Sequence, residues 1–184
     1  MIVQLNTNQI TADEFLRTDH KGYELVEGRL QEKNVGAFSS SAAYLIGLLL
    51  AARFDWQKYG RILDSEGGYQ CWPNHPLRVR KPDLSFIRRE KLPGGELPEG
   101  WIQSPPDFVI EVLSKNDALR EVEEKVAEYL AAGVPLIWVV DPKHKSVRVY
   151  RPDALSALHT GNDELFDDEV LPDFRCQVAE LFAD

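Results

Sequence analysis

The sequence predicts an α/β protein in which a central mixed β-sheet carries helices on both faces. Segments 107–113 and 134–141 are apolar on both faces, as is typical of strands in the middle of a covered sheet. Residues 120–133 lie between them, with apolar side chains at helical spacing and Gly133 as a stop. A strand, a helix and a strand in this order indicate a crossover between parallel strands.

The first third of the chain predicts a short helix, a hairpin and a long helix. Thr11 and Glu14 have the spacing of a capping box, so a short helix should follow Thr11. Residues 23–33 alternate about Gly28 and indicate two strands joined by a tight turn. Residues 39–60 begin with serines, carry a long apolar face and end at a glycine, which predicts a buried helix.

The middle of the chain adds further strands and one loop. Residues 61–73 and 77–87 read as strands that Gly, Pro and Asn separate. Residues 90–106 have the composition of a loop, and 145–150 alternate as a hairpin partner for 134–141. We expect one domain over residues 1–184.

Composition excludes several classes of protein. A net charge of -9 argues against a general coat for nucleic acid or an anionic membrane, although it permits a local basic patch. The two cysteines are far apart, which argues against a disulfide scaffold or a zinc ribbon and favours a reducing, cytoplasmic location. The longest apolar stretch, residues 42–54, is shorter than the roughly 18 residues typical of a membrane span.

Two of the apolar segments carry an acidic residue where a strand would bury hydrocarbon. Asp83 follows a proline, and Glu111 is surrounded by valine, isoleucine and leucine. A buried carboxylate is costly unless it is neutralised, paired or bound to a cation. Two such residues on neighbouring strands therefore predict a site for a hard cation, Mg²⁺ with Mn²⁺ as a substitute, to which the Val112 carbonyl could add a ligand. Lys125, at the edge of the apolar face of the following helix, could orient water and offset charge on phosphorus.

Each of these residues also has a purely structural interpretation. Asp83 could cap a turn after the proline, and Glu111 could pair with a buried arginine. Lys125 could form only an i,i+4 surface pair with Glu121.

The order of these motifs resembles a known family. Pro82–Asp83, Glu111 and a lysine resemble the signature of the PD-(D/E)XK restriction-endonuclease-like superfamily. The longer series YELVEG, RKPDLSFI, PDFVIEVLS, EKVAEYLAAGVPLIWVVDP and VRVY, over about residues 23–150, resembles the Uma-two family of candidate endonucleases. The resemblance implies a restriction-endonuclease-like fold and a Mg²⁺-dependent endonuclease that hydrolyses phosphodiester bonds in DNA.

The resemblance also implies roles for single residues. Glu24, in preference to Glu27, corresponds to the family's first acidic residue. The superfamily's lysine two residues after the glutamate is Leu113 here, and Lys125 on the next helix takes its place. Many relatives carry a histidine before the long helix where this chain has Ser39, Ser40 and Ser41, so either that histidine is not essential or activity here is in question. The expected catalytic residues are Glu24, Asp83, Glu111 and Lys125.

A basic cluster flanks the expected metal site, and it suits a polyanionic substrate such as DNA. A charged, solvated strand edge explains the same cluster equally well. Its candidate nucleic-acid contacts are Arg78, Arg80, Lys81, Arg88 and Arg89.

Two alternatives to a DNA endonuclease remain open at this point. One is a relic nuclease without activity that acts as a dimeric binding protein, and the other is a phosphodiesterase on RNA or nucleotides. A homodimer is also expected for the endonuclease, because cleavage of both strands benefits from two symmetric sites.

Overall fold

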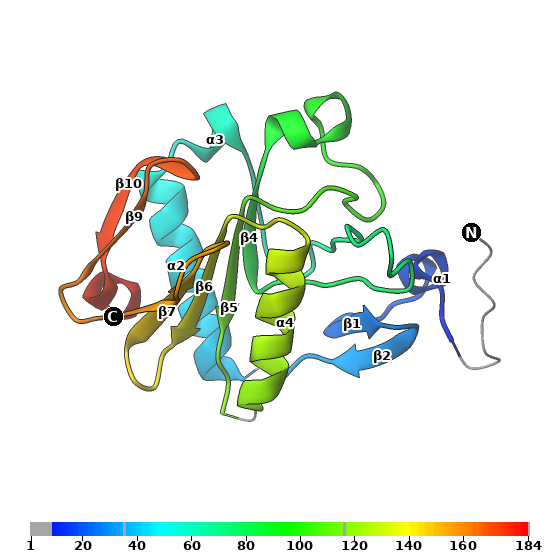
Figure 1. Ribbon diagram of the computed structural model, residues 1–184, viewed down its shortest axis with the longest axis horizontal. Coiled ribbons are helices and arrows are strands. Elements are labelled where there is room, and N and C mark those ends of the chain that lie inside the picture. Colours follow the sequence, from blue (N-terminus) through cyan, green and yellow to red (C-terminus); the bar gives the residue numbers. More distant parts are fainter. Residues whose placement is uncertain (1–8, 35, 116, 184) are drawn as a thin grey trace.

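The computed structural model describes residues 9–34, 36–115 and 117–183, and Figure 1 shows how their elements are arranged. The α-helices are α1 (Ala12–Arg17), α2 (Ala37–Arg53), α3 (Trp56–Tyr59) and α4 (Leu119–Ala131). The strands are β1 (Tyr23–Val26), β2 (Arg29–Glu32), β3 (Gly60–Leu63), β4 (Leu84–Arg88), β5 (Phe108–Val112), β6 (Leu136–Asp141), β7 (Ser146–Tyr150), β8 (Ala157–Thr160), β9 (Glu164–Asp167) and β10 (Leu171–Gln177). Three short 3₁₀ helices are η1 (Arg89–Lys91), η2 (Pro93–Gly95) and η3 (Val178–Phe182).

The centre of the fold is a six-stranded mixed sheet with the strand order β3-β4-β5-β6-β7-β8. β5 and β6 are parallel and are connected by α4, whereas the other neighbours in the sheet are antiparallel. The predicted strand–helix–strand crossover and the mixed sheet are therefore confirmed.

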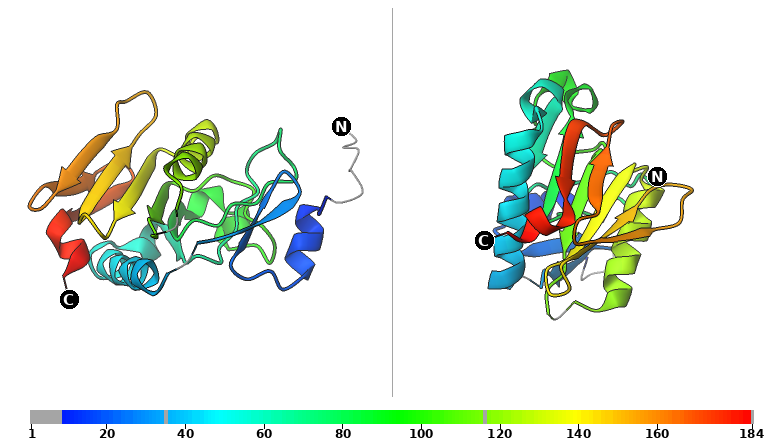
Figure 2. Two further views of the ribbon diagram at one scale, coloured as in Figure 1. Left: turned by 90° about the horizontal axis from the view of Figure 1, so that it is seen from below. Right: turned by 90° about the vertical axis from the view of Figure 1, so that its left-hand side faces the viewer.

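Helices cover both faces of this sheet, as the sequence predicts (Figure 2). On one face, Ile110 and Trp138 belong to the same core as Ile46 of α2. Residues of β9, β10 and η3 also belong to this core. On the other face, Val109 packs in a second core with Val126 of α4. Because side chains alternate along a strand, the apolar character of β5 and β6 on both faces supplies both cores.

The long helix differs from the expectation at both ends and on its outer face. It begins after Gly36, whose N–H donates to the Ser39 hydroxyl at 3.1 Å, and it ends at Arg53 rather than at Gly60. Phe54 leaves the helix because its ring packs edge-on against Phe86. Gly60 instead starts β3, where a Cβ atom would lie 2.0 Å from a main-chain carbonyl oxygen of β4. The helix is also less buried than expected, since Phe38, Tyr44, Leu45 and Leu48 are exposed.

The N-terminal hairpin forms as predicted and lies beside the segment that leads into β4. The capping box of α1 is present, and β1 pairs with β2 through a turn in which Glu27 and Gly28 have φ values of 49° and 78°. Leu25 of β1 also bridges to Val79. This bridge brings the hairpin, and Glu24 with it, to the residues just before Asp83.

Three regions differ from the sequence-based interpretation. The strand expected over 77–87 begins only at Leu84, and residues 79 and 80 form isolated bridges instead. After β3 ends at Leu63, the rest of segment 61–73 is loop, with isolated bridges from Tyr69 to Arg80 and to Ile102, because two adjacent glycines interrupt the strand. The strands after residue 150 were not anticipated. In the part of the chain that the structure describes, no helix is both long and apolar enough to cross a membrane.

Candidate active site

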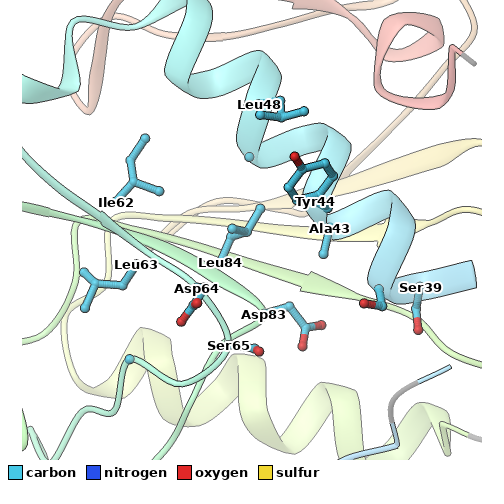
Figure 3. A pocket seen from close by; sticks show the side chains of 13 residues that line it. Ser39, Ala43, Tyr44, Leu48, Ile62, Leu63, Asp64, Ser65, Asp83 and Leu84 are labelled. Atoms are coloured by element: carbon cyan, nitrogen blue, oxygen red, sulfur yellow. The ribbon is translucent and has the colours of Figure 1, made fainter. Parts of the chain in front are cut away.

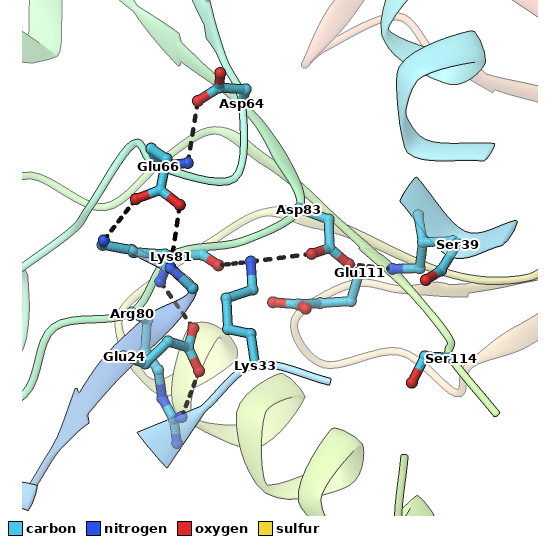
Figure 4. A network of polar contacts seen from close by, with 12 residues as sticks. Glu24, Lys33, Ser39, Asp64, Glu66, Arg80, Lys81, Asp83, Glu111 and Ser114 are labelled. Carbon is cyan, nitrogen blue, oxygen red and sulfur yellow. Dashed lines mark hydrogen bonds and ion pairs between the residues drawn. The ribbon is translucent and has the colours of Figure 1, made fainter. Parts of the chain in front are cut away.

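Asp83 lies directly before β4 and Glu111 lies in the neighbouring strand β5, so the two carboxylates come together at one edge of this strand pair. β4 and β5 are antiparallel with Leu84 opposite Ile110, so one further step in this register places Asp83 opposite Glu111. The N–H of Val112 donates to Oδ2 of Asp83 at 2.8 Å. Figure 4 shows the two carboxyl groups close together at the centre of a network of charged side chains.

The Glu111 carboxyl group is buried and its charge is only partly compensated. The Tyr129 hydroxyl donates to Oε1 at 3.0 Å, and the Lys125 ammonium lies 3.5 Å from Oε2. Burial raises the pKa of Glu111 to about 7; the Lys125 charge opposes this rise, and the charges of Asp83 and Glu24 add to it. A further cation beside Glu111 would therefore be stabilised.

Glu24, from β1, is almost completely buried, with both of its oxygens occupied. Oε2 lies 3.0 Å from Arg80 and 3.1 Å from Lys125, and Oε1 accepts the Lys81 N–H at 2.8 Å. Burial acts to raise the pKa of Glu24, but the charges of Lys125 and Arg80 together hold it below its usual value. Glu24 is thus an ionised partner for buried cations.

Lys125 projects from α4 to bridge two carboxylates that are 87 residues apart in sequence. Burial acts to lower its pKa, but the charges of Glu111 and Glu24 raise it, so the ammonium stays protonated. Its ion pairs within the described part of the chain are with these two residues rather than with Glu121. The surface-pair interpretation of Lys125 is therefore wrong, and so is the pairing of Glu111 with an arginine.

Lys33 is a member of the cluster that the sequence analysis missed. Its side chain is 5% exposed, and its ammonium lies 3.0 Å from Oδ1 of Asp83 and donates to the Lys81 carbonyl at 2.7 Å. A usable signal existed: Gln31 is opposite Glu24 in the hairpin, so Lys33, two residues later, emerges on the same face as Glu24. Tyr129 was likewise assigned only to the apolar face of its helix.

The basic cluster is not the exposed surface that a nucleic-acid contact requires. The three cations of this cluster that precede Asp83 in sequence are buried, and each contacts at least one carboxylate. They are Arg78 with Glu27 and Glu128, Arg80 with Glu24 and Glu128, and Lys81 with Glu66. This segment enters the core through the bridges of Val79 and Arg80 to neighbouring segments. Arg88 and Arg89, at the other end of β4, are partly exposed, and their contact with nucleic acid stays a prediction.

A groove of about 600 Å³ opens beside Asp83, between α2 and the loop that follows β3 (Figure 3). Ser39, Tyr44 and Asp64 line it, and its lining residues include no lysine or arginine. Asp83 also lines a second, smaller pocket together with Glu24, Lys33, Glu111 and Lys125, so it is the residue at which groove and charged cluster meet.

The donor set at this point fits a hard cation that takes few protein ligands. Across the residues described, no group of three or more His, Cys, Asp or Glu side chains is arranged to hold a metal ion. A cation here would therefore draw on the carboxylates of Asp83 and Glu111 and complete its coordination with water, main-chain or substrate oxygens, as Mg²⁺ commonly does.

Comparisons with known proteins agree with the fold. A solved structure described as a "putative nuclease belonging to DUF820", from Anabaena variabilis, superimposes with a TM-score of 0.80 and 21% sequence identity. The match covers 94% of this chain and 97% of that one, and it supports the restriction-endonuclease-like fold. No curated protein matches the chain. The model of the Uma2 (Uma-two) family, described as "Putative restriction endonuclease", matches residues 12–179, and the chain therefore belongs to this family.

Proposed function

We propose that the protein is a Mg²⁺-dependent endonuclease that hydrolyses phosphodiester bonds in DNA, with Mn²⁺ able to replace Mg²⁺. The observation that carries the proposal is the convergence of the Asp83 and Glu111 carboxylates (Figure 4), with the Lys125 ammonium 3.5 Å from Glu111. Membership in a family of nuclease type supplies the reaction class.

Asp83, Glu111 and the Val112 carbonyl are the proposed ligands of the cation. When bound, Mg²⁺ would supply positive charge to polarise the phosphate and to make an attacking water more acidic. The Val112 N–H fixes one oxygen of Asp83, and the Tyr129 hydroxyl fixes one oxygen of Glu111. The ligands are thus held in place by the fold before any cation arrives.

Lys125 and Glu24 have complementary proposed roles. The Lys125 ammonium, positioned beside Glu111, orients the water and offsets the charge that develops on phosphorus. Glu24 assists by holding Lys125 at 3.1 Å. Glu24 is therefore a positioning residue, because its oxygens already serve Arg80, Lys125 and the Lys81 N–H.

The groove beside Asp83 supports a proposed position for the DNA substrate. The groove beside α2 leads to Asp83, so a nucleotide next to the cleaved bond can lie there. Arg88 and Arg89 stand at the far end of β4, about 17 Å along a five-residue strand. Contacts from these arginines would therefore reach phosphates away from the cleaved bond.

The test is cleavage of supercoiled plasmid DNA by the wild-type protein with Mg²⁺ and with EDTA. We expect nicking or linearisation that needs Mg²⁺ and that Asp83→Asn or Glu111→Gln abolishes. Glu124→Gln is the matched control, since Glu124 is an exposed carboxylate that pairs with Arg120 on the same helix as Lys125. Its activity should equal that of the wild type.

The same assay separates the alternatives. Cleavage of RNA or nucleotides but not of DNA would show that the proposed substrate is wrong and that the proposed phosphodiester hydrolysis is right. If the wild type cleaves none of them with Mg²⁺ or Mn²⁺, the proposal of an enzyme is wrong and a binding function takes its place.

A further inference from the structure

We infer that Lys33 is an internal cation that occupies the metal-binding oxygen of Asp83 and must leave it before Mg²⁺ can bind. The inference rests on the proposed function only in taking Asp83 as a ligand of the cation. It adds a role for a residue outside the expected catalytic set.

The two oxygens of Asp83 have different partners. Oδ2 accepts the main-chain N–H of Val112 at 2.8 Å, a contact inside the sheet that a cation cannot replace without disturbing β5. Oδ1 is therefore the oxygen available to a metal ion, and the Lys33 ammonium lies 3.0 Å from it. Ammonium and metal ion compete for one atom.

Lys33 is held in this place by the fold. Its side chain is 5% exposed, which is unusual for a lysine. A second contact, 2.7 Å to the Lys81 carbonyl, ties it to the turn that carries Asp83. The N–H of the same Lys81 donates to Glu24, so the turn is fixed from both sides by residues of the N-terminal hairpin.

The charges explain why a metal ion would displace the ammonium. Three buried cations, Lys33, Lys125 and Arg80, contact four carboxylates: Glu24, Asp83, Glu111 and Glu128. Mg²⁺ at Oδ1 of Asp83 would place two positive charges against the Lys33 ammonium, and this contact between like charges is costly unless the ammonium withdraws or an anion arrives.

Lys33 can satisfy both conditions without leaving the site. An ammonium has three N–H donors, and the Lys81 carbonyl and Asp83 account for two of them. Lys33 can give up Asp83, keep its bond to Lys81 and direct the freed donors to a substrate phosphate. Binding of Mg²⁺ and binding of the phosphodiester would then favour one another through Lys33.

The test is calorimetric titration of Mg²⁺ into the protein without nucleic acid. Lys33→Met keeps the length of the side chain and removes its charge, and we expect the Mg²⁺ dissociation constant to fall about tenfold. A tenfold difference in the dissociation constant corresponds to a wild-type protein in which Lys33 is away from Asp83 in about one tenth of the molecules. Lys33→Arg keeps the charge and should not tighten binding.

Lys91→Met is the matched control, because Lys91 also lies 3.0 Å from a buried aspartate, Asp107, away from the site. This variant should bind Mg²⁺ as the wild type does. Equal or weaker Mg²⁺ binding by Lys33→Met than by the wild type would overturn the inference.

A second measurement uses only the wild-type protein and avoids any loss of folding in the variant. Acylation of lysine amines, located by mass spectrometry, should become faster at Lys33 when Mg²⁺ is added, while Lys91 stays unchanged. An unchanged or lower rate at Lys33 with bound Mg²⁺ would contradict displacement.

The outcomes for Lys33 and for the proposed function are separable. Tighter Mg²⁺ binding by Lys33→Met together with no cleavage of any nucleic acid supports the role of Lys33 and refutes the nuclease. Mg²⁺-dependent cleavage by the wild type, without tighter Mg²⁺ binding by Lys33→Met, supports the nuclease and refutes the role of Lys33.

Discussion

Replacing Glu24 by glutamine tests whether the buried charge cluster holds the fold together. Glu24 is 1% exposed and accepts contacts from Arg80, Lys125 and the Lys81 N–H. Glu24→Gln keeps the shape of the side chain and one acceptor oxygen but removes the negative charge. Two buried cations then lose a counter-charge.

The expected cost follows from what remains around those cations. Breaking a buried ion pair by removing one partner typically costs about 3–5 kcal/mol. Arg80 retains Glu128 at 2.7 Å and Lys125 retains Glu111 at 3.5 Å, so we expect the lower end, about 3 kcal/mol. For a chain of 184 residues this loss would lower Tm by roughly 6–12 °C.

Urea unfolding in EDTA measures the loss in the free energy of unfolding. The measurement is made at pH 8 because Glu111, with a pKa raised to about 7, is then ionised and paired with Lys125. Glu124→Gln, which breaks an exposed i,i+4 pair with Arg120, should change the free energy of unfolding by less than about 0.5 kcal/mol. A loss below about 1 kcal/mol for Glu24→Gln would refute the reasoning, because it would mean that the buried cations do not depend on this carboxylate.

Three further predictions concern catalysis, pH and assembly. Lys125→Met should lower the DNA cleavage rate by about 10²–10³ while calorimetry still detects Mg²⁺ binding, and wild-type cleavage by this variant would remove Lys125 from the mechanism. Because the raised pKa of Glu111 means that it holds its proton more tightly when folded, its contribution to stability in EDTA should be complete below pH 4.5 and disappear as the pH rises through about 7. Glu111→Gln should abolish that change in urea unfolding, and an identical pH profile for variant and wild type would show that Glu111 titrates normally. A homodimer should appear as a concentration-dependent mass in sedimentation, and Tyr44→Glu on the exposed face of α2 should favour the monomer if that face is the interface; a wild-type mass equal to one chain at all concentrations would exclude the dimer.

The central elements of the fold could be predicted because their signals are local. Apolar character on both faces identifies β5 and β6, and the spacing of apolar residues identifies α4. The end of α2 could not be predicted in the same way, since Phe54 leaves the helix to pack against Phe86. That contact joins segments that only the folded sheet brings together.

Site residues could be predicted where a charged side chain stands in an apolar segment of the sequence. Asp83 and Glu111 are carboxylates in apolar segments, and this conflict is visible in the sequence. Lys33 follows a polar strand, and alternation along that strand places it on the face of Glu24, but its burial depends on how the hairpin docks through Leu25 and Val79. The inward direction of Arg80 depends on the same docking, and a basic run alone does not reveal it.

A crystal soaked in Mn²⁺ and measured for anomalous scattering tests the central claim most directly. The account predicts an anomalous peak within coordination distance of Oδ1 of Asp83 and of the Glu111 carboxylate, with the Lys33 ammonium moved away from Asp83. A Mn²⁺ peak bound elsewhere, with Lys33 still in contact with Asp83, would contradict it.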